Sequence, residues 1–270
     1  MSAQRRPVVT LLTDYGVLDV FVGVCHGVIA KICPQARVID ITHGVSRQDV
    51  RGGAQLLAQS LPFLPVGVHV AVVDPTVGGN RRAVALELVD GRVLIGPDNG
   101  LLWPAAEVGG GVQRAAEISC SPWRLQPVSP TFHGRDIFVP VAAHIAAGDP
   151  FRQAGEPLDP ALLVRLEPAR SRVEGGTLVA TVSHADRFGN VQLAASAAQL
   201  ELELGERARV LLPAGETVSA RLVRTFSEVS EGEALLFEDS ARQLALALNG
   251  GSFAGHHAVH AGDELRISRD

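Results

Sequence analysis

The chain contains few cysteines and few aromatic residues, which excludes several classes of protein. Its 270 residues include 3 cysteines, 2 tryptophans and 1 tyrosine. The cysteines (Cys25, Cys33 and Cys120) have no metal-ligand spacing and predict neither a zinc site nor a disulfide framework. An odd number of cysteines without a secretory signal is typical of a reducing compartment. We therefore expect a cytoplasmic protein whose cysteines are small buried hydrophobic residues.

Basic clusters and long apolar runs are also lacking. The formal net charge is -5 at pH 7, without a lysine-rich tail or a basic stripe, which argues against a nucleic-acid partner. No uninterrupted apolar run reaches the length of a transmembrane helix, so we expect no membrane partner. With 46% hydrophobic and 20% charged residues, the composition is that of a folded enzyme rather than a disordered chain.

Several common catalytic and cofactor motifs are missing as well. No G-x-S-x-G nucleophile elbow occurs, and no P-loop or G-x-G-x-x-G follows a predicted strand. The histidines of HHAVH (His256, His257 and His260) lie near Asp263, but their spacing is not that of a zinc protease. A solvated loop is the better interpretation of that segment. We therefore expect neither a metal nor a cofactor.

Strand-like and helix-like segments alternate in the first part of the chain. Apolar runs predict strands at 8–13, 37–42, 69–74, 83–89 and 92–97, and amphipathic runs predict helices at 19–32, 46–61, 99–106 and 135–148. This order is typical of a mostly parallel sheet that is covered by helices. We therefore predict an N-terminal α/β domain over residues 1–168.

The texture of the sequence changes after a polar, glycine-bearing stretch near residue 170. Short alternating strands then follow at close spacing and are separated by turn residues, from TLVATVSHAD at Thr177 to DELRIS near the end. This spacing is typical of a compact barrel or sandwich. We predict a C-terminal all-β barrel domain over residues 173–270.

The run VVDPTVGGNRR, from Val72 to Arg82, carries the strongest chemical signal. An apolar strand ends at Asp74, and a glycine-containing loop leads to Arg81. Ligands of open α/β sheets bind at such strand ends, because the loops there converge on a crevice. His133, in TFHGRDIF, supplies an imidazole, so we predict a catalytic triad of Asp74, Arg81 and His133. The competing interpretation is a structural Asp74–Arg81 ion pair, with His133 as an unrelated surface residue.

Three further segments carry polar residues at predicted loops. Asp14, in TDYGVLD, follows the first strand and can accept hydrogen bonds from a ribose diol. In GPDNGLL, a turn and a helix start explain Asn99. HADRFGN is either a hairpin loop with a glycine near its tip, or a site that grips an amino-acid zwitterion and stacks on a purine.

Together these blocks resemble a known family. TDYG, IDITHGVSRQDV, VVDPTVGGNRRAV, PDNGLL, TFHGRDIFVPVAA and FGN occur in the order seen in S-adenosyl-L-methionine (SAM) hydroxide adenosyltransferases, which are related to fluorinases and chlorinases. The resemblance covers almost the whole chain. It implies an α/β domain followed by a β-barrel, hydrolysis of SAM to adenosine and L-methionine, and a homotrimer with active sites at subunit interfaces.

The resemblance also implies roles for individual residues. Asp14 would hold the ribose hydroxyls, Phe188 and Phe226 would flank the adenine, and Asn190 would bind its edge. Asp186 would take the ammonium group of the methionine moiety and Ser240 its carboxylate. The further substrate-binding residues that it implies are Gln48, Asn99 and Phe132.

Halogenating relatives differ from this chain at three positions. They have a tyrosine in place of Asp74, a serine in place of Gly134 and a tryptophan in place of Gln48. A carboxylate beside the nucleophile would repel a halide in a dry pocket, so water is the expected nucleophile. Two alternatives stay open: a SAM-dependent halogenase, and a SAM- or adenosine-binding module without catalysis.

Overall fold

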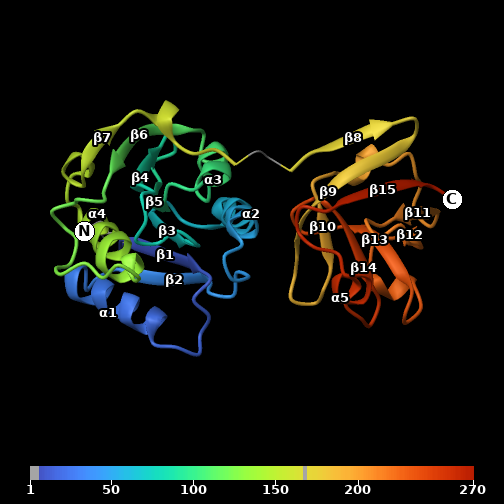
Figure 1. The fold of residues 1–270 in the computed structure, drawn as a ribbon, viewed down its shortest axis with the longest axis horizontal. Helices are drawn as coiled ribbons and strands as arrows, with labels where there is room; N and C mark the ends of the chain where they lie inside the picture. The colour runs from blue at the N-terminus through green and yellow to red at the C-terminus, as the bar shows by residue number, and fades with distance from the viewer. Residues whose placement is uncertain (1–5, 167–168) are drawn as a thin grey trace, which may run out of the picture. The chain divides into compact units, whose positions relative to one another are not determined.

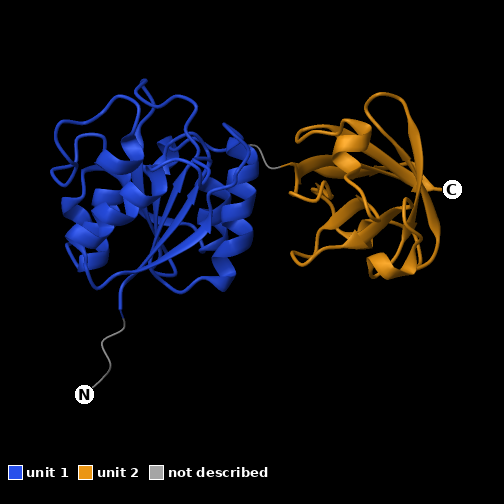
Figure 2. Ribbon diagram, turned by 90° about the horizontal axis from the view of Figure 1, so that it is seen from below, with its two compact units in different colours: residues 1–166 blue, residues 167–270 orange. Residues whose placement is uncertain are grey.

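The computed structural model describes residues 6–166 and 169–270. The chain divides after residue 166 into two compact units (Figure 2). The limit that the sequence predicts for the first domain, residue 168, lies outside the described residues. Among these residues, no helix is long and apolar enough to cross a membrane.

The first unit is built on a seven-stranded sheet with the order β2-β1-β3-β5-β4-β6-β7 (Figure 1). β1 pairs in parallel with β2 and β3, and β3 pairs in parallel with β5. The pairings of β4, β6 and β7 are antiparallel. The strands are β1 (Val8–Thr13), β2 (Arg37–Thr42), β3 (Val68–Val72), β4 (Ala83–Leu88), β5 (Val93–Pro97), β6 (Val112–Glu117) and β7 (Glu156–Leu158). The predicted α/β class with a parallel-rich sheet is confirmed.

Helices cover both faces of this sheet, because alternate side chains of its strands point to opposite sides. Val70 and Val72 of β3 belong to one core cluster, whereas Ala71 and Val73 belong to another. Residues of α1 and α4 pack into the first cluster, and residues of α2 and α3 pack into the second (Figure 1). The helices are α1 (Phe21–Ile32), α2 (Val50–Ser60), α3 (Trp103–Val108) and α4 (Val139–Ala147), with the short turns η1 (Leu61–Phe63), η3 (Phe151–Gln153) and η4 (Pro160–Leu162).

A single helix was predicted over residues 135–148, but the structure has a π-helical turn, η2 (Gly134–Phe138), before α4. Pro140 explains the change, because it has no N–H to bond the carbonyl of Asp136. That carbonyl accepts instead from the backbone N–H of Leu125, at 2.8 Å, and Val139 N donates to Gly134 O. The wider turn fixes the backbone at Gly134 and at His133, which precedes it.

The second unit is a closed β-barrel. Its strands follow one another in the order β10-β14-β13-β12-β11-β15-β9, and β9 also pairs with β10, which closes a barrel of seven strands; β8 extends β9 outside it. The elements are β8 (Ser171–Glu174), β9 (Thr177–Ala185), β10 (Val191–Leu193), η5 (Ala197–Gln199), β11 (Arg207–Leu211), β12 (Thr217–Leu222), η6 (Phe226–Glu228), β13 (Ala234–Glu238), β14 (Leu244–Leu248), α5 (Phe253–His257) and β15 (Glu264–Arg269). The predicted barrel is therefore confirmed.

The expectation of buried cysteines is right for two of the three. Cys25 and Cys33 are buried, but Cys120 is exposed. Cys120 lies in a turn after β6, where its apolar sequence neighbours do not bury the side chain. Apolar neighbours in the sequence were therefore not sufficient to predict burial.

His69, in the middle of β3, makes the stability of the first unit sensitive to acid. Its side chain is 0% exposed and its Nδ1 lies 3.0 Å from Thr10 Oγ1. Burial, with a smaller contribution from the positive charge of Arg92, lowers the pKa of His69 from 6.5 to about 4. As the pH falls, His69 of the unfolded chain is protonated near pH 6.5, whereas His69 of the folded chain is protonated only near pH 4. The free energy of unfolding therefore decreases as the pH falls from 6.5 to 4.

We expect this histidine alone to reduce the free energy of unfolding by about 3 kcal/mol between pH 7 and pH 4. His69→Leu should remove that part of the decline, whereas the exposed His256→Leu in the barrel should leave it unchanged. Both tryptophans, Trp103 and Trp123, lie in the first unit, so denaturant unfolding followed by tryptophan fluorescence reports on it. Equal pH dependence in wild type and His69→Leu would contradict the prediction.

Candidate active site

The structure brings Asp74, Arg81 and His133 together after the carboxyl end of β3. Arg81 Nε donates to Asp74 Oδ2 at 2.9 Å, and Arg81 Nη2 bonds the same oxygen. Arg81 Nη2 also lies 2.7 Å from Nδ1 of His133, the residue before η2. The Arg81 guanidinium therefore links the carboxylate of Asp74 to the imidazole of His133, although Asp74 and His133 are far apart in the sequence.

Asp74 has one oxygen that the protein does not use. Its side chain is only 4% exposed, and Oδ1 is buried without a hydrogen-bond partner among the described residues. A buried carboxylate oxygen without a donor is costly, because it has lost water and gained nothing in exchange. The arrangement thus offers a strong acceptor to a small polar molecule in the site.

The protonation state of His133 follows from its surroundings. Burial and the positive charge of Arg81 lower the pKa of His133, and they outweigh the carboxylates of Asp74 and Asp136. A neutral imidazole has one donor and one acceptor nitrogen. Because Nδ1 faces a guanidinium N–H, Nδ1 is the acceptor, and the ring proton is on Nε2.

Asn99 stabilises the backbone at the carboxyl end of β3. Its amide Nδ2 donates to the carbonyl of Val73 at 2.9 Å, and its Oδ1 accepts from Leu101 N at 3.2 Å. Val73 directly precedes Asp74, so these bonds fix the backbone that presents the carboxylate. The predicted substrate contact of Asn99 stays a prediction.

Asp14 and Gln48 meet in the loops that follow β1 and β2. The backbone N–H of Gln48 donates to Asp14 Oδ2 at 2.9 Å. Gln48 is exposed and has a φ of 65°, so the hydrogen bond holds a backbone conformation that is uncommon outside glycine. The bond engages Oδ2, one of the two carboxylate oxygens of Asp14.

An aromatic cluster adjoins the triad and contains two residues, Tyr15 and Phe21, that were not among the predicted site residues. The rings of Tyr15, Phe21 and Phe132 lie edge to face or tilted, with centroids 5.0–5.8 Å apart. Burial raises the pKa of Tyr15 far above its ordinary value, so its hydroxyl stays neutral. A Cβ atom added at Gly134 would lie 2.2 Å from that hydroxyl. Tyr15 lies inside the quoted TDYG block, which was the one available signal.

The second unit has a separate candidate site at the loop between β9 and β10 and its neighbours. A cavity of about 630 Å³ is lined by four residues that the resemblance implied, Asp186, Phe188, Asn190 and Phe226, together with Leu248, Gly250 and Gly251. The last three were not predicted from the sequence, because they line the cavity through the course of β14 and belong to no motif. The loop is a hairpin with Gly189 at a φ of 81°, which was one of the two interpretations of HADRFGN.

Within this cavity, Asp186 organises the loop. Its Oδ1 accepts from the backbone N–H groups of Phe188 and Asn190, and its Oδ2 accepts from Asn190 Nδ2 at 2.8 Å. Phe188 is 63% exposed. Ser240, in contrast, lies exposed in the turn after β13 and is not among the residues that line the cavity.

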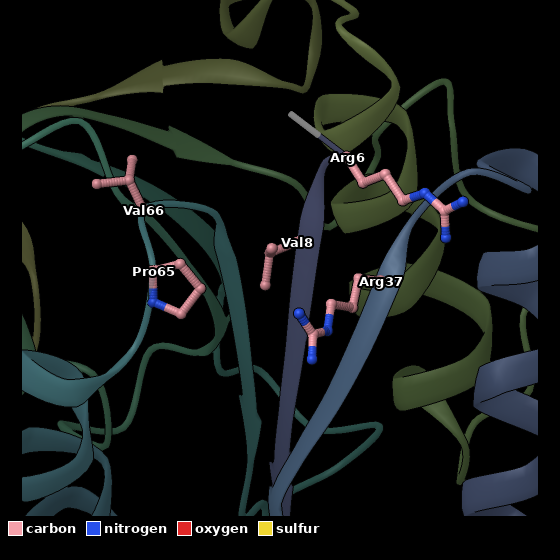
Figure 3. A pocket seen from close by; sticks show the side chains of 5 residues that line it. All are labelled: Arg6, Val8, Arg37, Pro65 and Val66. Carbon is pink, nitrogen blue, oxygen red and sulfur yellow. The ribbon is translucent and has the colours of Figure 1, made fainter. Parts of the chain in front are cut away.

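A cavity of about 730 Å³ in the first unit lies elsewhere. It is lined by Arg6, Val8, Arg37, Pro65 and Val66 (Figure 3). Val8 and Arg37 begin β1 and β2, whereas Asp74 follows the carboxyl end of β3. Since these strands are parallel, the cavity and the triad belong to opposite ends of the sheet.

Comparison with known proteins agrees with this architecture. Two family models match the chain: the SAM hydroxide adenosyltransferase N-terminal domain over residues 9–155, and the C-terminal domain of the same family over residues 180–266. A crystal structure of an uncharacterized conserved protein from Thermotoga maritima has a TM-score of 0.88 and 35% identity, and covers 97% of this chain and 100% of its own.

Two curated relatives extend over nearly the whole chain. The (R)-S-adenosyl-L-methionine hydrolase of Salinispora tropica is 50% identical over 262 residues, which are 97% of this chain and 98% of that protein. The fluorinase of Actinoplanes sp. is 28% identical and covers 100% of both chains. With matches to both domain models and to a relative of this similarity, the chain belongs to the SAM hydroxide adenosyltransferase family.

Proposed function

We propose that the protein hydrolyses SAM to adenosine and L-methionine, with water attacking the 5′ carbon of the ribose. The observation that carries the proposal is the buried Oδ1 of Asp74, an acceptor without a partner among the described residues. The name of the Salinispora tropica relative, at 50% identity, supports the same reaction.

The chemistry requires a proton acceptor and little else. The leaving group is a neutral thioether, so its departure needs no general acid. Water is a weak nucleophile and has to lose a proton, for which Asp74 Oδ1 is the acceptor. Arg81 holds the other oxygen of that carboxylate, which orients Oδ1. The attack removes the sulfonium charge, so a site with little water favours the transition state.

His133 has a different part in this mechanism. Its Nδ1 bonds Arg81, and its Nε2 carries the proton, so the neutral ring has no free basic nitrogen. His133 therefore donates a hydrogen bond that orients the water or a substrate oxygen. Among the triad residues, this leaves Asp74 as the general base.

Binding of SAM is assigned to both units. Asp14 binds the ribose hydroxyls, and Gln48, Asn99 and Phe132 belong to the same binding region of the first unit. Phe188 and Phe226 stack on the adenine, for which the exposed Phe188 ring and the shared cavity provide support. Asn190 binds the adenine edge, and Asp186 and Ser240 bind the methionine moiety.

A halogenase is the second candidate, because the fluorinase of Actinoplanes sp. is also related to this chain. The site disfavours it on two grounds. A halide beside Asp74 Oδ1 would meet a negative charge in a buried environment, where like charges repel strongly. Gly134 offers no hydroxyl, and its neighbour Tyr15 fills the space that a side chain there would need.

Incubation with SAM in water enriched in ¹⁸O tests the reaction. We expect one heavy oxygen in the 5′-hydroxyl of adenosine and none in methionine, as read by mass spectrometry. Adenosine and methionine that form without label would refute attack by water at the 5′ carbon. Formation of 5′-halo-5′-deoxyadenosine with added chloride or fluoride would favour the halogenase.

The aromatic cavity predicts that loss of a stacking ring weakens SAM binding but does not slow the chemical step. Phe188→Ala should raise the KM for SAM by about 5–150-fold, since stacking contributes about 1–3 kcal/mol per base, and should leave kcat nearly unchanged. Phe63→Ala is the matched control, because Phe63 is 85% exposed on the first unit and lies outside both sites. Steady-state kinetics separates the two parameters. A lower kcat at unchanged KM would contradict the assignment of Phe188.

We further propose a cytoplasmic homotrimer in which the triad of one subunit and the aromatic cavity of a neighbour bind one SAM molecule. The support is the resemblance to the family, together with the presence of the two residue sets in separate units. Co-expression of Asp74→Asn and Phe188→Ala subunits should restore activity at low SAM, because some interfaces then combine intact halves. Light scattering that gives a monomer would refute the trimer.

A further inference from the structure

His26, Asp40 and His43 form a compact cluster that the proposed reaction does not use. His26 lies on α1, Asp40 lies on β2, and His43 lies in the loop after β2. His26 Nε2 lies 2.8 Å from Asp40 Oδ1, and His43 Nε2 lies 3.1 Å from the same oxygen. Among the described residues, only this group brings three histidine, cysteine or acidic ligand atoms within 4.8 Å of one another.

The buried member of the cluster has an unused nitrogen. The His43 side chain is 5% exposed, and its Nε2 has no hydrogen-bond partner within the described parts of the chain. The nitrogen lies 3.1 Å from Asp40 Oδ1, a distance that forms an ion pair only when the ring is protonated. Burying a polar atom without a partner is costly, whereas a metal ion between the nitrogen and the carboxylate would satisfy both.

The other ring nitrogen of His43 has the outer partner that metal-binding histidines usually show. Nδ1 lies 2.9 Å from Thr13 Oγ1, which also accepts from the backbone N–H of Tyr15 at 3.2 Å. With the ring proton on Nδ1, donated to Thr13, the Nε2 lone pair is free to coordinate. The remaining ligands are accessible, because His26 is 38% and Asp40 is 39% exposed.

We propose that His26, Asp40 and His43 bind one divalent transition-metal ion of the zinc type. Two imidazoles and a carboxylate form a donor set that Zn²⁺ accepts, with solvent completing the coordination. The ion connects α1, β2 and the loop after β2. That loop in turn bonds the segment before α1, because Gly16 N donates to His43 O at 2.8 Å. Asp14 lies in that segment, so the ion stabilises the ribose-binding loop and takes no part in proton transfer.

These three residues were not among the metal candidates that the sequence suggested, because they have no recognised metal-ligand spacing. They come from a helix, a strand and a loop, and only the pairing of β1 with β2 and the packing of α1 bring them together. The histidine-rich segment near the C-terminus attracted the metal interpretation instead. His257 of that segment already bonds Glu216, at 3.0 Å.

Titration of the untagged, metal-free protein with Zn²⁺ against a chromophoric chelator tests the site. We expect one tight site, and a loss of affinity in His43→Gln and Asp40→Asn that exceeds the about 10–100-fold cost of losing an outer partner. Thr13→Val keeps all three ligands and should weaken binding by about tenfold. With Co²⁺ in place of Zn²⁺, visible absorption bands should appear in wild type and be absent from His43→Gln.

Matched controls separate this cluster from other histidines. His144→Gln breaks a histidine–aspartate pair of similar length, 2.7 Å to Asp149, and should bind Zn²⁺ like wild type, as should His257→Gln. His26→Gln changes an accessible residue, so it tests the site even if His43→Gln fails to fold. Unchanged Zn²⁺ affinity in His26→Gln and Asp40→Asn, or no saturable binding in wild type, would overturn the proposal.

Discussion

Asp74→Asn is expected to lower kcat for SAM hydrolysis by about 10²–10⁴-fold, the usual contribution of a general base, while SAM binding stays near the wild-type level. Asparagine keeps the shape of the side chain. Its amide oxygen has to accept from Arg81, which donates at the Oδ2 position, so the NH₂ group points to the position of Oδ1. A donor then stands where the water needs an acceptor, and proton removal fails without loss of the pocket.

Asp98→Asn provides the matched control. Asp98 is also 4% exposed and also pairs with an arginine, Arg82, but both of its oxygens are used: Oδ2 by Arg82, and Oδ1 by the backbone N–H of Val164 at 2.9 Å. We expect this variant to lower stability and to keep most of the activity per folded molecule. Single-turnover rates and calorimetric SAM affinity would be measured for both. Equal losses of rate in the two variants, or a Kd for SAM that rises in proportion to the loss of kcat, would remove Asp74 from its role.

The apolar pattern of the sequence predicts most of the fold because burial decides most of it. Buried runs such as Val68–Val72 predict strands, and the alternation in the second half predicts the barrel. β6 was missed because its pattern, VQRAAE, has polar residues at its exposed start. α2 begins at Val50, later than predicted, because the side chain of Asp49 accepts from Gly52 N and caps the helix there.

The site was less predictable because it depends on contacts between distant segments. Asp74 and Arg81 are close in the sequence and follow one strand, so their pairing could be inferred. His133 directly precedes the π-helical turn η2, and no pattern in the sequence predicted that turn. In the part of the chain that the structure describes, Asp74 Oδ1 and His43 Nε2 have no hydrogen-bond partner, a result of packing that no motif records.

Gly134 provides the second large effect, through its contact with Tyr15. Gly134→Ala is expected to lower kcat/KM by about 10²-fold, since displacements of about 1 Å near the reacting atoms have effects of that size. The new Cβ would lie 2.2 Å from the Tyr15 hydroxyl and 3.2 Å from Tyr15 Cζ, so the ring has to move. Its movement disturbs the cluster with Phe21 and Phe132, next to His133.

The double variant Gly134→Ala/Tyr15→Phe distinguishes this steric cause from a general loss of stability. Removing the hydroxyl eliminates the 2.2 Å contact and leaves contacts of 3.2 Å to Tyr15 Cζ and 3.3 Å to Tyr15 Cε2, which a small shift of the ring relieves. The double variant should therefore recover to within about tenfold of Tyr15→Phe alone. Gly27→Ala on α1 is the control, because a Cβ there meets nothing within 4 Å and alanine favours the helix. Kinetics and thermal melting of these four variants would be compared with those of wild type.

Activity that stays low in the double variant would show that Tyr15 does not mediate the effect. A fully active Gly134→Ala would show that the backbone absorbs the added atom. The expected recovery, in contrast, would mean that the tyrosine and the glycine form one steric unit, which keeps any side chain at residue 134 out of the site where we propose that Asp74 activates water.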